Sequence, residues 1–228
     1  MEKKYKFQEK IFICLILDSL SGIFERSSRE VIIKNMDKNG GQVKEIAIVD
    51  IETSGFQEKG GLIVEIGIVG LNLETGIVTN EFDSIVKEDE FNEKHSEYPF
   101  GWIFQNSDLR YDDVLSANNL TDMLPEIQNV LNKYSLGATA YNKAFDFGFL
   151  KSRGLQIKEL DCIMLSATNV VNLPPNFGYS TPKWPKVEEA WEYFFPQVEY
   201  KEAHRALDDA KHEALIAYEL YKLGNFIA

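Results

Sequence analysis

The sequence has little of several features that would place it in a specialised class. Its 228 residues include two cysteines, Cys14 and Cys162, which are too few for a disulfide framework and lack zinc-site spacing. The apolar run Ile11 to Leu17 is too short to cross a bilayer, and no small-residue cleavage site follows it closely. We therefore expect a cytoplasmic protein with reduced thiols and no membrane partner.

Basic residues are scarce relative to acidic ones. The chain carries 24 Lys and Arg against 36 Asp and Glu, a formal net charge of −12, and it has no basic run. This balance argues against a broad electrostatic platform for nucleic acid. Contact with nucleic acid would have to be local, through metal ions, backbone amides and a few aromatic side chains.

The composition divides the chain into two parts. Residues 1–43 are dense in apolar side chains that are not confined to one helical stripe, and Asn39-Gly40-Gly41 indicates a flexible break. We expect residues 1–43 to form a helical N-terminal extension that packs on the domain. A dimer contact and a membrane-surface segment are the alternatives. Residues 44–228 would form the functional domain, since 44% hydrophobic residues are ordinary for a globular core.

The order of strand and helix signals predicts an α/β fold. Strands are expected at Glu45–Glu52, Leu62–Leu71 and Gly76–Val86, and the short loops between them indicate an antiparallel meander. Two further short strands are expected, at Gly137–Tyr141 and around Ile163-Met164. One helix is expected with Thr121 or Asp122 as its cap. Others are expected from Lys143 to Arg153, stopped by Gly154, from Val187 and just after His204. The result would be a mixed sheet flanked by helices.

Two carboxylates lie two residues apart at the end of the first strand. Asp50 and Glu52 point to the same face of a strand, and Val49 and Ile51 point to the other face. Burying two acids together is unfavourable unless a positive charge neutralises them, and a divalent cation is the obvious partner. Thr53-Ser54-Gly55 then supplies the turn that ends the strand.

Two later stretches add acids near helix starts. Asn142 is suited to cap a helix, and Asp146 follows four residues later on the same side; alone, Asp146 would be a helix-surface acid. His204 and Asp209 are five residues apart, about 140° around a regular helix. They converge only if His204 precedes the helix. Periodicity does not choose between Asp208 and Asp209.

Together these stretches resemble the motifs of the DEDDh 3′–5′ exonucleases, the DnaQ-like group that includes RNase T and oligoribonuclease. Residues 49–55 look like D-x-E-T-x-G, residues 142–150 like N-x-x-F-D-x-x-F-L, and residues 204–210 like H-R-A-L-x-D-A, which selects Asp209. The resemblance covers about residues 44–223. It implies a ribonuclease-H-like fold, a mixed sheet of a three-strand antiparallel meander plus two parallel strands.

This chain departs from the family pattern in two places. Tyr141 stands where many members have His. The stretch Trp102 to Leu109 stands where many have a His-Gly-Ile sequence that touches the terminal nucleotide. The catalytic set survives both changes, but the grip on the terminal nucleotide differs.

The resemblance implies a two-metal hydrolase. Asp50, Glu52, Asp146 and Asp209 would hold two divalent cations, with Asp50 bridging both. An all-carboxylate set suits Mg²⁺ or Mn²⁺ rather than zinc. His204 would be the general base, because its intrinsic pKa lies near neutrality.

Residues near the same motifs are expected to hold the end of the nucleic acid. The predicted substrate-binding residues are Thr53, Ser54, Gly55, Phe56, Asn142 and His204. Trp102 and Phe104 are further stacking candidates, unless they fill the core beneath their loop. The other two histidines, His95 and His212, have no such context and are expected at the surface.

The sequence therefore predicts a 3′–5′ exonuclease that releases nucleoside 5′-monophosphates from single-stranded DNA or RNA 3′ ends. DNA is slightly preferred as the expected substrate, although no residue reads the 2′-hydroxyl. The alternatives are an RNA-trimming enzyme like oligoribonuclease or RNase T, a non-catalytic module on the nuclease fold and a small-molecule phosphohydrolase. A homodimer and a polymerase partner both stay open.

Overall fold

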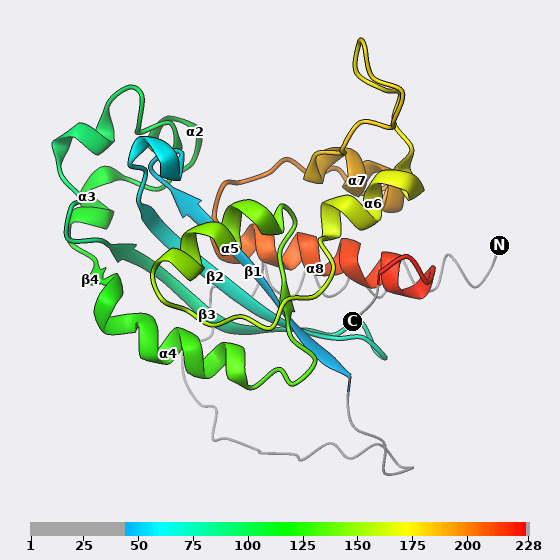
Figure 1. The fold of residues 1–228 in the computed structure, drawn as a ribbon, viewed down its shortest axis with the longest axis horizontal. Helices are drawn as coiled ribbons and strands as arrows, with labels where there is room; N and C mark the ends of the chain where they lie inside the picture. Colours follow the sequence, from blue (N-terminus) through cyan, green and yellow to red (C-terminus); the bar gives the residue numbers. More distant parts are fainter. Residues whose placement is uncertain (1–43, 227–228) are drawn as a thin grey trace. The chain divides into compact units, whose positions relative to one another are not determined.

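The structure is a computed structural model that describes residues 44–226. The expectations for residues 1–43 fall outside the described residues. Within the described span, a five-stranded mixed sheet in the order β4-β3-β2-β1-β5 carries helices on both faces (Figure 1). The predicted α/β class with a three-strand meander is confirmed.

The sheet is built from three long strands and two very short ones. The strands are β1 (Glu45–Thr53), β2 (Ile63–Asn72), β3 (Val78–Lys87), β4 (Asn118–Asn119) and β5 (Ala138–Thr139). β1, β2 and β3 pair antiparallel in sequence. β5 adds parallel to β1, and β4 adds parallel to β3.

Most of the helices follow β3 along the chain, and the short strands β4 and β5 lie before and after α4. They are α2 (Ile103–Asn106), α3 (Tyr111–Leu115), α4 (Leu120–Asn132), α5 (Lys143–Ser152), α6 (Ile163–Val171), α7 (Val187–Phe194) and α8 (Ala206–Lys222), with short 3₁₀ turns η2 (Gln57–Lys59) and η3 (Glu93–Ser96). The helices predicted around α4, α5, α7 and α8 are confirmed. α4 begins slightly earlier than predicted, because Asn119 caps it by accepting a hydrogen bond from the N–H of Thr121.

The strand predicted around Ile163-Met164 is wrong, because α6 begins there. Ile163 and Ala167 are both fully buried and lie one helical turn apart, so the apolar spacing there is that of a helix. A single parallel bridge between Ala138 and Glu159 is what forms in place of the expected strand. The second parallel strand of the sheet is β4, which the sequence did not indicate.

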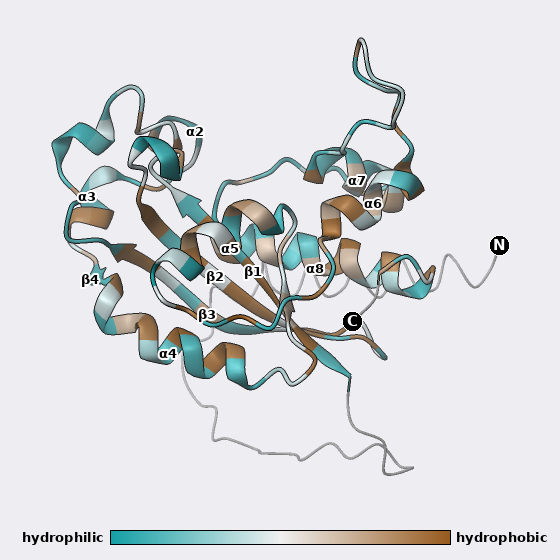
Figure 2. Ribbon diagram, viewed as in Figure 1, coloured by the Kyte–Doolittle hydropathy of each residue, from teal (hydrophilic) through white to brown (hydrophobic). Residues whose placement is uncertain are grey.

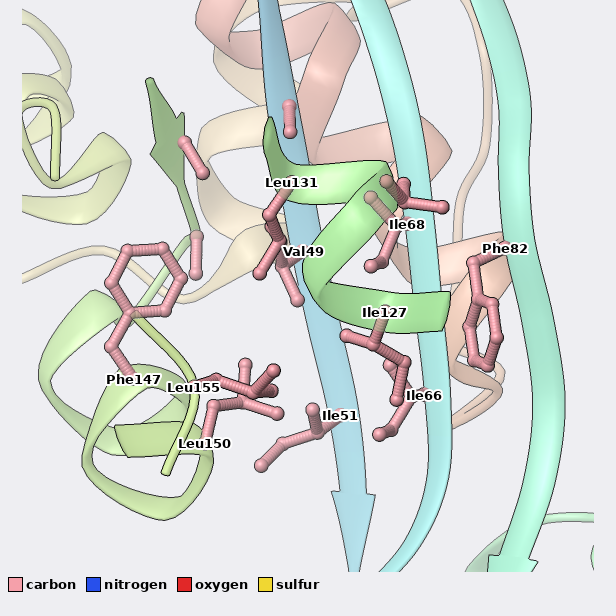
Figure 3. Packing of buried hydrophobic residues seen from close by; sticks show 14 of the residues in the cluster. Val49, Ile51, Ile66, Ile68, Phe82, Ile127, Leu131, Phe147, Leu150 and Leu155 are labelled. Carbon is pink, nitrogen blue, oxygen red and sulfur yellow. The ribbon is translucent and has the colours of Figure 1, made fainter. Parts of the chain in front are cut away.

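The main core lies between one face of the sheet and helices α4 and α5. Figure 3 shows Val49 and Ile51 of β1 and Ile66 of β2 facing Ile127 and Leu131 of α4. Figure 2 shows why α4 fits this face, since its ribbon alternates between hydrophobic and hydrophilic residues. α8 packs on the sheet's other face, against β1, β2 and β3. The alternate residues of β1, including Asp50 and Glu52, therefore face α8.

The shortness of β5 leaves part of β1 open. β5 pairs only with Ala47 and Ile48. Beyond them, no strand among residues 44–226 neighbours the edge of β1 on that side, and the chain turns into α5 at Lys143. This opening lies beside the end of β1 that carries the two acids.

A glycine lets α8 approach the sheet closely. Gly67 of β2 pairs with Asp50. A Cβ atom at position 67 would lie 2.3 Å from the backbone of Ala206 and Leu207. The first turn of α8 therefore touches β2 directly, and this contact sets the helix start beside the acids of β1.

We predict that Gly67→Ala lowers the free energy of unfolding by about 1–3 kcal/mol, because the new methyl group forces α8 off the sheet. Denaturant unfolding of the full chain measures this. Gly148→Ala is the matched control: its Cβ would meet only the side chain of Gln57, at 3.7 Å, and alanine favours the α5 helix. Equal stability of Gly67→Ala and wild type would contradict the close contact.

Candidate active site

Two of the predicted acids come from the end of β1. Asp50 and Glu52 are half-buried and point away from the core cluster that contains Val49 and Ile51. This is the side of the sheet that α8 covers. The alternation of the strand thus separates apolar packing from the acidic side, as the sequence predicted.

Asp146 reaches the same place from α5. It is 4% exposed, and its Oδ1 accepts a hydrogen bond from the backbone N–H of Ile51 at 3.3 Å. That N–H is free to donate because β5 ends before reaching it. The open edge of β1 is therefore what admits a side chain from a neighbouring helix.

His204 and Asp209 lie on either side of the start of α8. His204 has φ +53, in the left-handed region, and precedes the helix by two residues. Asp209 lies in the first turn and is 1% exposed. Its carboxylate accepts hydrogen bonds from the Arg205 N–H at 3.0 Å and from the Tyr200 hydroxyl at 2.8 Å. Asp208 is exposed, so the two neighbouring acids point to different sides of the helix, Asp209 inward and Asp208 to solvent.

These side chains converge. One potential ligand atom each from Glu52, His204 and Asp209 lies within 4.8 Å of the others. Asp50 and Asp146 lie close enough to interact electrostatically with each other. The structure therefore brings together the predicted set from three separate segments, in agreement with the spacing of His204 and Asp209.

The surroundings of these carboxylates disfavour their ionisation. The pKa of Asp50 is raised well above its usual value, chiefly by burial and then by Glu213 and Asp146. The pKa of Glu52 is also raised well above its usual value, by burial and then by Asp209. Burial raises the pKa of Asp146 to about 7. Like charges in a desolvated site resist ionisation together.

The donor set fits a hard divalent cation. Four carboxylates provide oxygen ligands, and the adjacent histidine is the sole nitrogen donor of the predicted set. Such a cation would relieve both the burial penalty and the mutual repulsion that raise these pKa values. The crowding of acids at one place therefore has a physical explanation if Asp50, Glu52, Asp146 and Asp209 hold metal.

Glu213 is a further buried carboxylate beside the site that the sequence did not indicate. It lies one turn beyond Asp209 on α8 and is 2% exposed. Its Oε2 accepts a hydrogen bond at 3.2 Å from the N–H of Tyr141, which lies two residues before α5. The available signal was its position, four residues after Asp209 in a helix face otherwise rich in alanine.

A buried ion pair fixes the start of α8, and it too was missed. Glu65 of β2 is 1% exposed and receives hydrogen bonds from the Arg205 guanidinium at 2.7–3.1 Å and from the Ala206 N–H at 3.1 Å. Arg205 also donates to Asp108 at 2.6 Å. One side chain thus joins the sheet, the residue after His204 and the loop before α3.

Trp102 lies on that same loop region and packs edge-on against His204, with ring centroids 4.8 Å apart. It is 55% exposed, so it does not fill the core. Phe104 does pack into a small buried cluster under this loop. The backbone N–H of Gly101 donates to the Ser54 carbonyl, which ties the loop to the turn after β1.

The predicted substrate-binding residues differ in their availability. Ser54 is fully buried. Its N–H donates to the Leu62 carbonyl and its hydroxyl accepts from the Leu62 N–H, so its side chain holds the turn. Phe56 is 58% exposed and lies edge-on to Phe145. Asn142 is exposed and occupies the N-cap position of α5 without a side-chain capping bond. Thr53 and Gly55 are half-buried beside them.

The expected surface position of His95 is wrong. The ring is 1% exposed, stacks on Phe91 at 5.5 Å and caps the η3 turn through Asn92. His212 is also largely enclosed, between Trp191 and Tyr200. Neither histidine belongs to the acidic cluster identified above, and both act in packing.

Solved structures share this fold. The nuclease domain of 3′hExo, a DEDDh family member bound to rAMP, aligns with a TM-score of 0.60 and 17% identity over 82% of this chain and 97% of that chain. Cell-death related nuclease 4 aligns with a TM-score of 0.58 and 14% identity over 80% of this chain and 65% of that chain. The two structures therefore share the fold of this chain.

Sequence comparison gives the family. The DNA polymerase III PolC-type of Clostridium perfringens (strain 13 / Type A) is 28% identical over 172 residues, which are 75% of this chain and 11% of the polymerase. The profile of the 3′-5′ exoribonuclease Rv2179c-like domain matches residues 45–221. The chain belongs to this family of exonuclease domains.

None of the helices among residues 44–226 combines the length and the apolar character needed to span a bilayer.

We predict that the chain, stripped of metal with EDTA, loses stability between pH 5 and pH 8. Folding raises the pKa of these carboxyls, so their stabilising contribution is complete below about pH 4, where they are protonated in both states. It is lost as the pH rises through about 7, the pKa of Asp146. Mg²⁺ at a hundred times its Kd should restore about 2.7 kcal/mol at pH 8.

Thermal unfolding with EDTA or Mg²⁺ measures both effects. Asp146→Asn keeps an oxygen acceptor for the Ile51 N–H but cannot ionise, so this variant should lose part of the pH dependence. Asp208→Asn, at an exposed acid, should keep it. A wild-type melting temperature that is flat from pH 5 to 8 in EDTA would contradict the raised pKa values.

Proposed function

We propose that this chain is a 3′–5′ exoribonuclease that removes nucleoside 5′-monophosphates from the 3′ ends of single-stranded RNA. The observation that carries the proposal is the convergence of four carboxylates and His204 from β1, α5 and the start of α8. The chain's family membership supports the reaction class. The alternative of a non-catalytic module is weaker, because a decayed site would have lost a ligand.

We propose that Asp50, Glu52, Asp146 and Asp209 hold two Mg²⁺ or Mn²⁺ ions. When bound, such ions supply charge stabilisation for the phosphate and an acidified water. The protein's part is to keep these oxygens close together despite their repulsion. The backbone N–H of Ile51 orients Asp146, while Tyr200 and Arg205 orient Asp209.

His204 is the proposed general base. It takes the proton from the attacking water as the new P–O bond forms and the bond to the 3′ oxygen of the preceding nucleotide breaks. Its left-handed backbone brings it out of the α8 helix and toward Glu52 and Asp209. Such a base typically contributes about 10²–10⁴-fold in rate.

The terminal nucleotide would lie between exposed aromatic groups near the site. Phe56 and Trp102 are both more than half exposed, and Trp102 contacts His204. Thr53 and Gly55 lie at the end of β1 and Asn142 at the N-cap of α5, and these residues are proposed to contact the terminal sugar and phosphate. Trp102 would take the place of the His-Gly-Ile stretch that this chain lacks.

RNA is proposed over DNA on the strength of the family, which is described as an exoribonuclease. The sequence alone leaned slightly to DNA, and the similarity to a DNA polymerase covers only 11% of that protein. DNA is therefore the second candidate substrate.

The substrate prediction is tested with matched 5′-labelled single-stranded RNA, single-stranded DNA and duplex DNA. We expect stepwise shortening from the 3′ end, fastest on single-stranded RNA, with Mg²⁺ or Mn²⁺ and none in EDTA. Faster cleavage of DNA would make DNA the substrate. The absence of products from every oligonucleotide with both metals would rule out the nuclease proposal and favour a small-molecule phosphate ester.

The roles within the third motif are tested by neighbouring acids. Asp209→Asn should reduce kcat/KM by more than the roughly 10²–10⁴-fold typical of a lost general base, which is also the range expected for His204→Ala. Asp208→Asn should be close to wild type, because Asp208 is exposed on the helix. Circular dichroism checks that each variant is folded. Loss of activity in Asp208→Asn alone would show that the acids are misassigned.

A further inference from the structure

The chain between α6 and α7 forms a hairpin whose composition differs from that of the rest of the protein. Residues 172–186, here called the aromatic hairpin, contain three aromatic residues, two lysines and no Asp or Glu, in a chain of net charge −12. An antiparallel bridge between Leu173 and Lys183 closes it. Its prolines are Pro174, Pro175, Pro182 and Pro185. Proline restricts the backbone, so the hairpin can present side chains with little core beneath it.

The aromatic rings of the hairpin are exposed. Phe177 is fully exposed, Tyr179 is 73% exposed and Trp184 is 62% exposed. Large apolar groups gathered on one exposed segment indicate a binding surface. An open recess of about 310 Å³ is lined by Asn176, Tyr179, Thr181, Pro182, Lys183 and Trp184.

The base of the hairpin is connected to the candidate active site. The Tyr141 hydroxyl donates to the carbonyls of Pro185 at 3.0 Å and Lys186 at 2.9 Å. Tyr141 lies two residues before α5, the helix that carries Asp146, and its N–H donates to Glu213. Lys186 is also close enough to Glu202 to interact with it electrostatically, and Glu202 lies 3.9 Å from His204. The hairpin thus rises from the surroundings of the site, as Figure 1 shows above α6 and α7.

We propose that the aromatic hairpin is a second contact for single-stranded nucleic acid, on which bases upstream of the 3′ terminus stack. This inference rests on the proposed function. Stacking needs exposed ring faces and no particular base sequence. The absence of carboxylates within the hairpin spares the phosphates a repulsion that much of this acidic surface would impose.

The hairpin acts through its rings more than through charge. The Lys183 ammonium is paired with Glu189 at 2.6 Å, so little of its charge is available for phosphate. Lys183 lies five positions after Gly178 at the turn, so this arm of the hairpin can span at most roughly 17 Å. The rings are therefore spread along a length that several nucleotides can occupy. Binding to this segment should depend less on salt than binding through phosphates would.

The test compares substrates of increasing length. In the full chain, Trp184→Ala and Tyr179→Ala should lower kcat/KM roughly 5- to 100-fold on a long single-stranded RNA, the factor for one lost stacked base. The loss should shrink as the RNA is shortened toward a dinucleotide. Ile77→Ala is the matched control, since Ile77 is 61% exposed in the β2–β3 turn at the other end of the sheet. A loss that is the same at every length would overturn the proposal.

A binding measurement separates this inference from the proposed reaction. Fluorescence anisotropy of labelled single-stranded RNA in EDTA reports binding without cleavage. Trp184→Ala should weaken it, Trp184→Phe should restore it, and the loss should persist as salt is raised. RNA binding that depends on Trp184 in a chain that cleaves no oligonucleotide would sustain the hairpin contact and reject the exonuclease. Equal binding by wild type and Trp184→Ala would reject the hairpin contact, whatever the activity.

Discussion

The repulsion among buried carboxylates is the constraint on which the rest of this structure depends. Asp50, Glu52, Asp146 and Asp209 meet in a desolvated place where their ionisation is disfavoured. No packing advantage explains such a cluster, because apolar residues of similar volume would be cheaper to bury. The fold must therefore hold the acids in place by other means, and the surrounding hydrogen bonds and close backbone contacts are arranged to do so.

Three backbone features supply this restraint. β5 is too short to cover β1, so the N–H of Ile51 is left to bind Asp146. Gly67 lets the start of α8 lie directly on β2. The left-handed backbone conformation of His204 lets its side chain reach the same site as Asp209, which lies five positions later. Each feature is small, and together they define where three distant segments meet.

The periodic parts of this architecture could be predicted from the sequence. Alternation in β1 separated Asp50 and Glu52 from the core, and the five-residue spacing required His204 to precede its helix. Contacts made across the fold could not be predicted. The pairing of Glu65 with Arg205 joins residues 140 positions apart, and the burial of His95 depends on Phe91 and the loop around it. α6 was missed because Ile163-Met164 has the composition of a short buried strand, and only its tertiary packing shows a helix.

The two ion pairs of Arg205 differ in their exposure to solvent, so they respond differently to salt. Its contact with Glu65 is shielded from solvent, whereas its other partner, Asp108, has a side chain that is 78% exposed. Dissolved salt screens exposed ion pairs far more than enclosed ones. The ion pair between Arg205 and Glu65 therefore persists at high salt, whereas the ion pair between Arg205 and Asp108 is weakened. The loop that carries Trp102 can loosen as ionic strength rises, while the helix start beside His204 keeps its anchor on the sheet.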